Sequence, residues 1–468
     1  MEQRLRMMYS SNAMWASSGY GVQGKSLLPR LAELPVLGGR QNISMFAWWG
    51  LQGGVHNVDG FMVYPRHEDP YGNDAIGGHA HDFAANLVIS LIDVWVMHDT
   101  AQKVHPALWV PWIPIDHEDV PHQVLHSLQG CHIPLTYSRW GSNLLSEEGM
   151  RNYYIPHGVE PSIYRVAPRS LSDRLNSFKQ RLVDGCDFLA VMVAANKGYP
   201  DRKGFQFQLE AWAEFAKDKP RAKLYIHTDP TATQHGLDIA SMLHRLNLDR
   251  QVYFPQKYDL LNGYPDMFLS HVYNAADVFL GASMSEGFGI PIIEAQACGT
   301  PVIVTDFSSM PELVRQGVAV TPIARLWTHQ GSYWRIPDPV EIRVALEDRY
   351  QYVMDVDDDA LCEEREKLSK TIHDEFDWDM IVEQYWKPIL EEFNAVAPDA
   401  AVCHRSNHEM GTSPFATFVN DWQSLEMEAR RTVHTQEMDE FDADSTIAKG
   451  AVNETNNEVP SKEVANAG

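Results

Sequence analysis

Residues 285–295 have the sequence SEGFGIPIIEA, and they lie between two short apolar runs. One run covers residues 277–281, and the other covers residues 301–306 after Gly299 and Thr300. Both runs have the length and composition of buried strands. We therefore expect a strand, a tight loop, a helix and a second strand. That parallel unit places a ligand at the carboxyl end of its first strand.

The glycines and the proline of this stretch predict a loop that leads into a helix. Gly287 and Gly289 lack a Cβ, so the backbone can turn sharply and approach a ligand closely. Proline suits a helix that begins near Ile290 and Pro291, because its missing N–H would be unpaired there. The free amides of such a helix N-terminus attract phosphate.

Two glutamates flank the loop. Glu286 precedes the helix, and Glu294 lies roughly one turn inside it. Their carboxylates can accept hydrogen bonds from hydroxyl groups, so the pattern fits a phosphate flanked by sugars. The alternative is a pair of solvated glutamates, one of which stabilises the helix N-terminus by its charge. The Glu-x7-Glu spacing alone is common, whereas the full string with its strands is far more specific.

The string EGFGIPIIEA, followed by ACGTPVI at residues 297–303, resembles the donor-site signature of family-4 retaining glycosyltransferases. The resemblance implies an α/β protein of the GT-B fold, with two Rossmann-like, doubly wound parallel-sheet domains facing each other across a cleft. It implies that Glu286 binds hydroxyls of the donor sugar and that Glu294 binds those of the ribose. It also places the backbone of Phe288, Gly289 and Ile290 against the phosphate or sugar.

Composition limits the classes of protein. The 468 residues suggest two to three domains, and the 44% apolar content with 13 tryptophans suits a globular enzyme. The five cysteines are scattered, which favours reduced thiols in the cytosol. The net charge of −25 opposes binding to nucleic acid or to an anionic membrane. We find neither a transmembrane run nor the apolar core of a signal peptide, so we predict a cytoplasmic protein.

The octet GYGVQGKS at residues 19–26 matches the P-loop pattern, so a nucleoside triphosphatase is an alternative function. In a P-loop the first glycine follows its strand almost immediately, whereas a polar loop separates this octet from the strand predicted at residues 4–9. The other interpretation places Gly19 and Gly21 in the first strand-to-helix loop of a Rossmann-like domain. The family resemblance then puts both glycines beside the donor phosphates and the acceptor.

Two apolar runs in the N-terminal part end in polar residues, which is where α/β folds form sites. Residues 91–97 predict a buried strand ending at His98. Residues 108–115 contain prolines and predict an edge or bulged strand. The resemblance implies that a residue after this strand faces the anomeric carbon of the donor. Asp116 is the first choice and His117 the second, with helix capping as the alternative for each.

A basic segment follows the strand predicted at residues 188–195. Arg202 and Lys203 match the Arg-Lys-Gly element of the family, which implies that they neutralise the donor diphosphate. A departing diphosphate needs cations to stabilise its charge, and arginine offers two parallel bonds. The alternative is a solvated basic turn. An arginine that often precedes this element is missing, which leaves the role of Lys197 open.

Alternating strands and helices predict a domain order. We expect an N-terminal acceptor domain at residues 1–180 and a nucleotide-sugar-binding domain at residues 185–375. A helix at residues 378–397 is expected to cross back onto the N-terminal domain. The acidic residues 400–468 predict a disordered tail.

The sequence thus predicts an enzyme that moves a sugar from a nucleotide sugar to an acceptor hydroxyl, with retention. The nucleotide sugar is a co-substrate, and no metal is expected, because the histidines of residues 56–82 lack a ligand spacing. The alternatives are the P-loop enzyme and a non-catalytic GT-B module that binds nucleotide sugars. The sugar, the base, the acceptor and the oligomeric state stay open.

Overall fold

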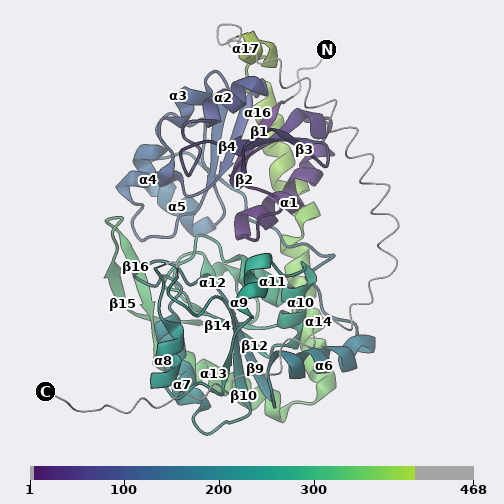
Figure 1. The fold of residues 1–468 in the computed structure, drawn as a ribbon, viewed down its shortest axis with the longest axis vertical. Helices are drawn as coiled ribbons and strands as arrows, with labels where there is room; N and C mark the ends of the chain where they lie inside the picture. The colour runs from purple at the N-terminus through teal and green to yellow at the C-terminus, as the bar shows by residue number, and fades with distance from the viewer. Residues whose placement is uncertain (1–4, 234, 406–468) are drawn as a thin grey trace, which may run out of the picture. The chain divides into compact units, whose positions relative to one another are not determined.

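A computed structural model describes residues 5–233 and 235–405 of the chain (Figure 1). Within these residues the chain forms an eight-stranded sheet, a six-stranded sheet and a two-stranded sheet. The two large sheets are built in turn along the chain, each from strands that alternate with helices. The predicted α/β class with parallel sheets is therefore confirmed.

The first sheet has the spatial order β3-β4-β2-β1-β5-β6-β7-β8, and all its pairs are parallel except β3 with β4. Its apolar strands are buried because helices pack on the sheet, so they lack an alternating pattern. The strands are β1 (Met7–Asn12), β2 (Ile43–Gln52), β3 (His56–Val58), β4 (Phe61–Arg66), β5 (Leu87–Leu91), β6 (Leu108–Ile113), β7 (Leu135–Thr136) and β8 (Tyr153–Tyr154). The helices between them are α1 (Gly19–Ala32), η1 (Arg40–Asn42), α2 (Ile76–Asp82), η2 (Val94–Val96), α3 (Thr100–Val104), α4 (His122–Ser127) and α5 (Arg139–Glu147).

The second sheet has the order β11-β10-β9-β12-β13-β14 and is parallel throughout. Its strands are β9 (Phe188–Val193), β10 (Ala222–His227), β11 (Val252–Tyr253), β12 (Val278–Gly281), β13 (Val302–Thr305) and β14 (Gly317–Val320). Two helices precede it, η3 (Arg169–Leu171) and α6 (Ser172–Leu182). The helices that belong to it are α7 (Phe205–Ala216), α8 (Ile239–Arg245), α9 (Lys257–Asn262), α10 (Met267–Ala275), α11 (Ile290–Ala297), α12 (Met310–Leu313) and α13 (Pro339–Asp355).

The helix α14 (Asp358–Phe376) packs on α11, where the Ser369 hydroxyl donates to the carbonyl of Ala297. The chain then returns to the first sheet through α15 (Trp378–Ile381), the π-helical turn η4 (Val382–Trp386), α16 (Lys387–Val396) and α17 (Ala400–Arg405). The Trp386 ring packs edge-on against Trp112 of β6, with centroids 5.0 Å apart. The Tyr153 hydroxyl donates to Glu392 at 2.9 Å. Figure 1 accordingly draws the yellow-green α16 among the purple and blue elements of the first sheet.

Two strand predictions for the N-terminal part are wrong. The strand at residues 91–97 is instead β5, which ends at Leu91, and the following apolar residues form η2 and its flanks. Ile92 and Val96 are buried, so their apolar character reflects burial and not extended backbone. The strand β6 is internal, because it lies between β5 and β7. Pro111 is tolerated because β7 pairs only with the two residues that follow it.

The P-loop interpretation is wrong because the whole octet at residues 19–26 lies inside α1, which Ser18 caps. For the same reason the other interpretation is wrong about the loop, since Gly19 and Gly21 belong to the first turn of α1. No loop remains there to enclose a phosphate, and Lys25 instead pairs with Asp266 at 2.5 Å. The first six residues of the predicted tail, 400–405, form α17 instead. Residues 406–468 lie outside the described residues.

The sequence interpretation missed an antiparallel hairpin formed by β15 (Pro322–Trp327) and β16 (Tyr333–Pro337). It follows β14 in the chain and forms a separate two-stranded sheet. Glu118, from the loop after β6, exchanges two backbone hydrogen bonds with Tyr333, of 2.9 and 3.0 Å. The hairpin therefore joins the second half of the chain to the loop that carries Asp116 and His117.

Candidate functional site

The motif at residues 285–295 joins β12 to α11. Gly289 precedes the helix with a φ of +108°, a conformation that favours glycine, and Pro291 lies in the first helical turn. The Ser309 hydroxyl holds the loop by donating to the carbonyls of Glu286 at 2.8 Å and Phe288 at 2.7 Å. The predicted strand, loop, helix and strand are present, and β12 and β13 pair in parallel.

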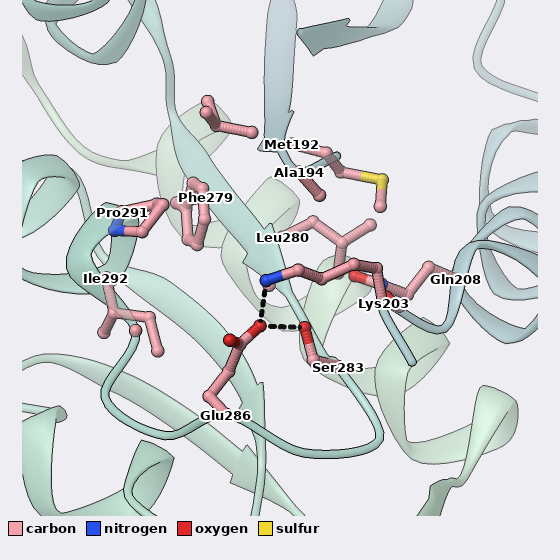
Figure 2. A pocket seen from close by; sticks show the side chains of 13 residues that line it. Met192, Ala194, Lys203, Gln208, Phe279, Leu280, Ser283, Glu286, Pro291 and Ile292 are labelled. Atoms are coloured by element: carbon pink, nitrogen blue, oxygen red, sulfur yellow. Dashed lines mark hydrogen bonds and ion pairs between the residues drawn. The ribbon is translucent and has the colours of Figure 1, made fainter. Parts of the chain in front are cut away.

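Three side chains converge on the carboxylate of Glu286, and Figure 2 shows two of them, Lys203 and Ser283. Lys203 Nζ lies 2.6 Å from Oε1, and Arg202 lies 3.0 Å from Oε2. The Ser283 hydroxyl donates to Oε1 at 2.7 Å. The side chain of Glu286 is only 12% exposed. The structure therefore brings together the two predicted cations and the first glutamate of the motif.

Charge stabilises this cluster. Burial alone would raise the pKa of Glu286, but Lys203 and Arg202 lower it to about 2. Burial lowers the pKa of Lys203, although Glu286 opposes that change. Glu286 is therefore ionised at neutral pH. An incoming anion would compete with it for both cations.

The pocket beside this cluster is small. It lies between β9, β12 and the start of α11, and it has a volume of about 20 Å³. Figure 2 shows Lys203 crossing it toward Glu286, with Pro291 and Ile292 on another side. This volume holds about one water molecule. A larger ligand would have to displace the pair of Lys203 and Glu286.

Glycines lie where the half of the chain that forms the eight-stranded sheet meets the half that forms the six-stranded sheet. A Cβ on Gly287 would lie 2.4 Å from the Cβ of Pro114, so this glycine permits close packing between the two halves. A Cβ on Gly19 would lie 3.4 Å from Ile290, in ordinary contact. Gly21 faces its own loop, because a Cβ there would meet the carbonyl of Ala16 at 2.4 Å.

Asp116 and His117 have different surroundings. The Asp116 carboxylate accepts from His117 Nδ1 at 2.7 Å and lies 3.9 Å from Arg202. Burial opposes ionisation, yet the bond from His117 and the charge of Arg202 keep the pKa of Asp116 below its usual value. His117 is 2% exposed, and its ring lies 5.2 Å from that of Trp334 in the hairpin. Asp116 thus faces the cationic cluster, while His117 packs beneath the hairpin.

Glu294 lies apart from Glu286. It is 6% exposed, accepts a hydrogen bond of 3.1 Å from the Tyr273 hydroxyl, and does not line the small pocket. Burial raises its pKa to about 7. Phe288 is buried too, with its ring 5.2 Å from that of His157. The two glutamates therefore have different surroundings, since Glu286 pairs with cations and Glu294 contacts a tyrosine hydroxyl.

Three residues near this site were missed. Burial and the charge of Asp116 raise the pKa of Asp93, and the charge of Arg202 partly offsets this increase. The hydroxyls of Tyr20 and Tyr137 lie 3.3 Å apart. A signal for Asp93 existed, since it interrupts the apolar run that we took for a strand. No sequence signal marks the tyrosines, because they meet only in the folded chain.

Two features are absent from the described residues, 5–233 and 235–405. No group of three or more His, Cys, Asp and Glu side chains there is arranged to hold a metal ion. No helix there is long and apolar enough to cross a membrane.

The part of the site that contains Arg202, Lys203, Glu286 and Glu294 lies in a segment that matches a family model. Residues 189–327 match the model of the family described as glycosyl transferases group 1. A D-inositol 3-phosphate glycosyltransferase of Segniliparus rotundus is 26% identical over 255 residues, which are 52% of this chain and 53% of the relative. The O-antigen chain mannosyltransferase B of Escherichia coli is 49% identical over 50 residues, or 11% of this chain and 13% of the relative. The chain spans about half the length of the first relative and less of the second.

Solved structures share the fold at low identity. Anabaena HepE in complex with UDP-glucose has a TM-score of 0.59 and 14% identity, covering 84% of this chain and 100% of that one. Sucrose-phosphate synthase from Thermosynechococcus elongatus has a TM-score of 0.61 and 16% identity, with coverage of 84% and 100%. These likenesses confirm the predicted GT-B fold. Residues 189–327 therefore match the glycosyl transferases group 1 model, and the described chain has the GT-B fold.

Proposed function

We propose that the protein transfers a sugar from a nucleotide sugar to an acceptor hydroxyl, with retention of the anomeric configuration. The observation that carries this proposal is the contact of Arg202 and Lys203 with Glu286 at the start of α11. Two cations and a helix N-terminus together suit a diphosphate. The carboxylate between the cations suits the hydroxyls of an attached sugar.

Each residue has a part in the proposed mechanism. The diphosphate replaces Glu286 as the partner of Arg202 and Lys203, which then stabilise the charge that develops as it departs. Glu286 turns to the hydroxyls of the donor sugar, and Glu294 accepts from the ribose. The amides near Gly289 meet the phosphate or sugar, and they are held by the loop that Ser309 fixes.

Retention follows from attack on the face that the diphosphate leaves. The bond from the anomeric carbon to the phosphate oxygen breaks, and the bond to the acceptor oxygen forms. The departing phosphate oxygen takes the acceptor's proton, so the reaction needs no nucleophile from the enzyme. Asp116 would lie on the side of the anomeric carbon, since it faces Arg202 from the first half. The cations do the work of charge stabilisation, so the proposal requires no metal.

The neighbours suggest a first donor to test. HepE was solved with UDP-glucose and also with UDP and glucose. We therefore propose a uridine nucleotide sugar as the first candidate. We keep the cytosol as the proposed location, which the scattered cysteines support.

The test is the release of nucleoside diphosphate from UDP-, GDP- and ADP-sugars, with and without a panel of carbohydrate acceptors. We expect one donor to be consumed faster when an acceptor is present, and we expect excess EDTA to leave the rate unchanged. Binding of a nucleotide sugar without any release would favour a non-catalytic module. Failure of every nucleotide sugar to bind or react would refute the proposal.

A further inference from the structure

A second pocket, far larger than the first, lies in the first half of the chain. Its volume is about 700 Å³. Three segments line it, and each follows a strand of the eight-stranded sheet, namely β4, β5 and β6. The residues that matter to its chemistry are Asp69, Tyr71, Trp95, His98, His122 and His126.

The topology puts this pocket at the edge of the sheet where the parallel strands end. The strands β4, β5 and β6 belong to the parallel part of the sheet, so their carboxyl ends lie at one edge. The same edge carries Asp93 and Asp116. Trp95 follows Asp93 by two residues, and His122 opens the helix that follows the Asp116 loop. A molecule in this pocket would therefore lie on the first half's side of the proposed reaction.

The pocket is formed in advance by its own hydrogen bonds. The Asn73 side chain donates to the carbonyl of Val96 at 2.9 Å and accepts from the backbone of His98 at 2.9 Å. The Asp69 carboxylate accepts from the backbone of Tyr71 at 2.8 Å. These bonds tie the segment after β4 to the segment after β5, and such preformed concave sites suit small molecules.

The lining combines aromatic surface with polar groups. Tyr71 is 39% exposed and Trp95 is half-buried, so both rings can be reached from the pocket. Aromatic faces pack against the C–H faces of sugar rings, while imidazole and amide groups bind hydroxyls. No lysine or arginine lines the described pocket. Asp69 adds negative charge, and its backbone bonds keep the pKa of that carboxyl below its usual value although burial opposes them.

We propose that this pocket is the acceptor subsite and that it takes an uncharged carbohydrate ring. A phosphorylated sugar would bring a dianion next to the Asp69 carboxylate, and no lysine or arginine lines the pocket to pair with it, which is unfavourable. The assignment rests on the proposed function.

The test measures binding without turnover, on the full chain. Saturation-transfer NMR with maltose and with glucose 6-phosphate reports which probe touches the protein. We expect a signal from maltose and a much weaker one from glucose 6-phosphate. Tyr71→Ala and Trp95→Ala should each weaken maltose binding by about tenfold, which is the loss expected for one aromatic platform.

A matched control separates this pocket from other exposed tyrosines. The exposed fraction of Tyr352 on α13 is 41%, which is similar to the 39% of Tyr71. Tyr352→Ala should leave maltose binding unchanged. Trp95 is half-buried, so Trp95→Ala can misfold. Tyr71 is exposed, so Tyr71→Ala still tests the pocket if Trp95→Ala fails to fold. Stronger binding of glucose 6-phosphate, no maltose binding, or equal maltose binding by wild type and both pocket variants would overturn the proposal. Donor binding, measured separately with UDP-glucose, shows whether the proposed function fails as well.

Discussion

The pocket at Glu286 and the pocket at Tyr71 differ in size, charge and sequence signal. The pocket at Glu286 holds about 20 Å³ and is crossed by the ion pair of Lys203 and Glu286, whereas the pocket at Tyr71 holds about 700 Å³ and has no lysine or arginine in its lining. The first lies in a recognisable motif, and the second lies among residues with no motif. A diphosphate has fixed charge and geometry, so it demands particular residues at particular positions. An uncharged ring can be held by many arrangements of aromatic and polar groups, so its site leaves little trace in sequence.

The largest expected effect is the loss of rate in Lys203→Ala, which tests the pocket at Glu286, called the charged pocket below. Lys203→Ala removes one of the two cations from the departing diphosphate. We expect the rate of nucleoside diphosphate release at saturating donor to fall by roughly 100-fold. The control is Lys25→Ala, because Lys25 is 53% exposed and belongs to the discarded P-loop octet. Equal losses in the two variants would remove the contrast between the charged pocket and the rest of the surface.

Gly287→Ala tests the contact between the halves. The new Cβ would lie 2.4 Å from that of Pro114, so we expect a loss of stability of about 1–3 kcal/mol. Gly78→Ala is the control, since Gly78 is inside α2 with nothing within 4 Å of an added Cβ. There the helix propensity of alanine should stabilise the protein by up to about 1 kcal/mol. Thermal unfolding measures both, and destabilisation by Gly78→Ala alone would contradict the packing argument.

The pH dependence of stability tests Glu294, the glutamate that lies outside the charged pocket. Burial raises the pKa of Glu294 to about 7 in the folded chain, so the protonated form stabilises the fold at low pH. That stabilisation is complete below the ordinary pKa of glutamate and is lost as pH rises through about 7. Between pH 6 and 8 the wild type should lose roughly 1 kcal/mol that Glu294→Gln keeps.

Thermal unfolding of wild type and Glu294→Gln across this pH range measures the difference. The variant should gain on the wild type as the pH rises. A constant difference, or one of opposite sign, would mean that Glu294 is ionised in the folded protein. Glu294 would then be a buried carboxylate that is ionised at neutral pH, as Glu286 is.

The smallest effect concerns the hairpin. Arg335 pairs with Glu118 at 2.6 Å, and both side chains are about 30% exposed. Arg335→Ala should therefore cost at most about 1 kcal/mol, and less in high salt. Arg169→Ala is the control, because its pair with Asp359 is far more exposed and is expected to matter even less. If Arg335→Ala changes stability no more than Arg169→Ala, the hairpin is not held by this pair.

Local patterns predicted what depends on neighbours in sequence. The strand, loop, helix and strand around residues 285–295 could be predicted, because glycine, proline and apolar runs act within a few residues. The meeting of Arg202 and Lys203 with Glu286 was expected only through the family resemblance, since 83 residues or more separate them. Their chemical roles stay predictions.

Long-range packing explains what could not be predicted. The close approach of Gly287 to Pro114 could not be predicted, because Pro114 belongs to a segment far away in sequence. The buried residues after Leu91 resembled a strand because burial in a loop cluster and burial in a sheet select the same side chains. The hairpin escaped notice since its contact at Glu118 is formed with the other half of the chain.

The central claim is that the charged pocket exchanges its own carboxylate for a nucleotide sugar. The most direct test is a calorimetric titration of UDP-glucose into the wild type and into Glu286→Ala. We predict one binding site per chain, and at least about tenfold weaker binding by the variant, because a charged hydrogen bond to the sugar is lost. Equal affinities for the two proteins would contradict the account, as would an absence of binding by UDP-, GDP- and ADP-sugars alike.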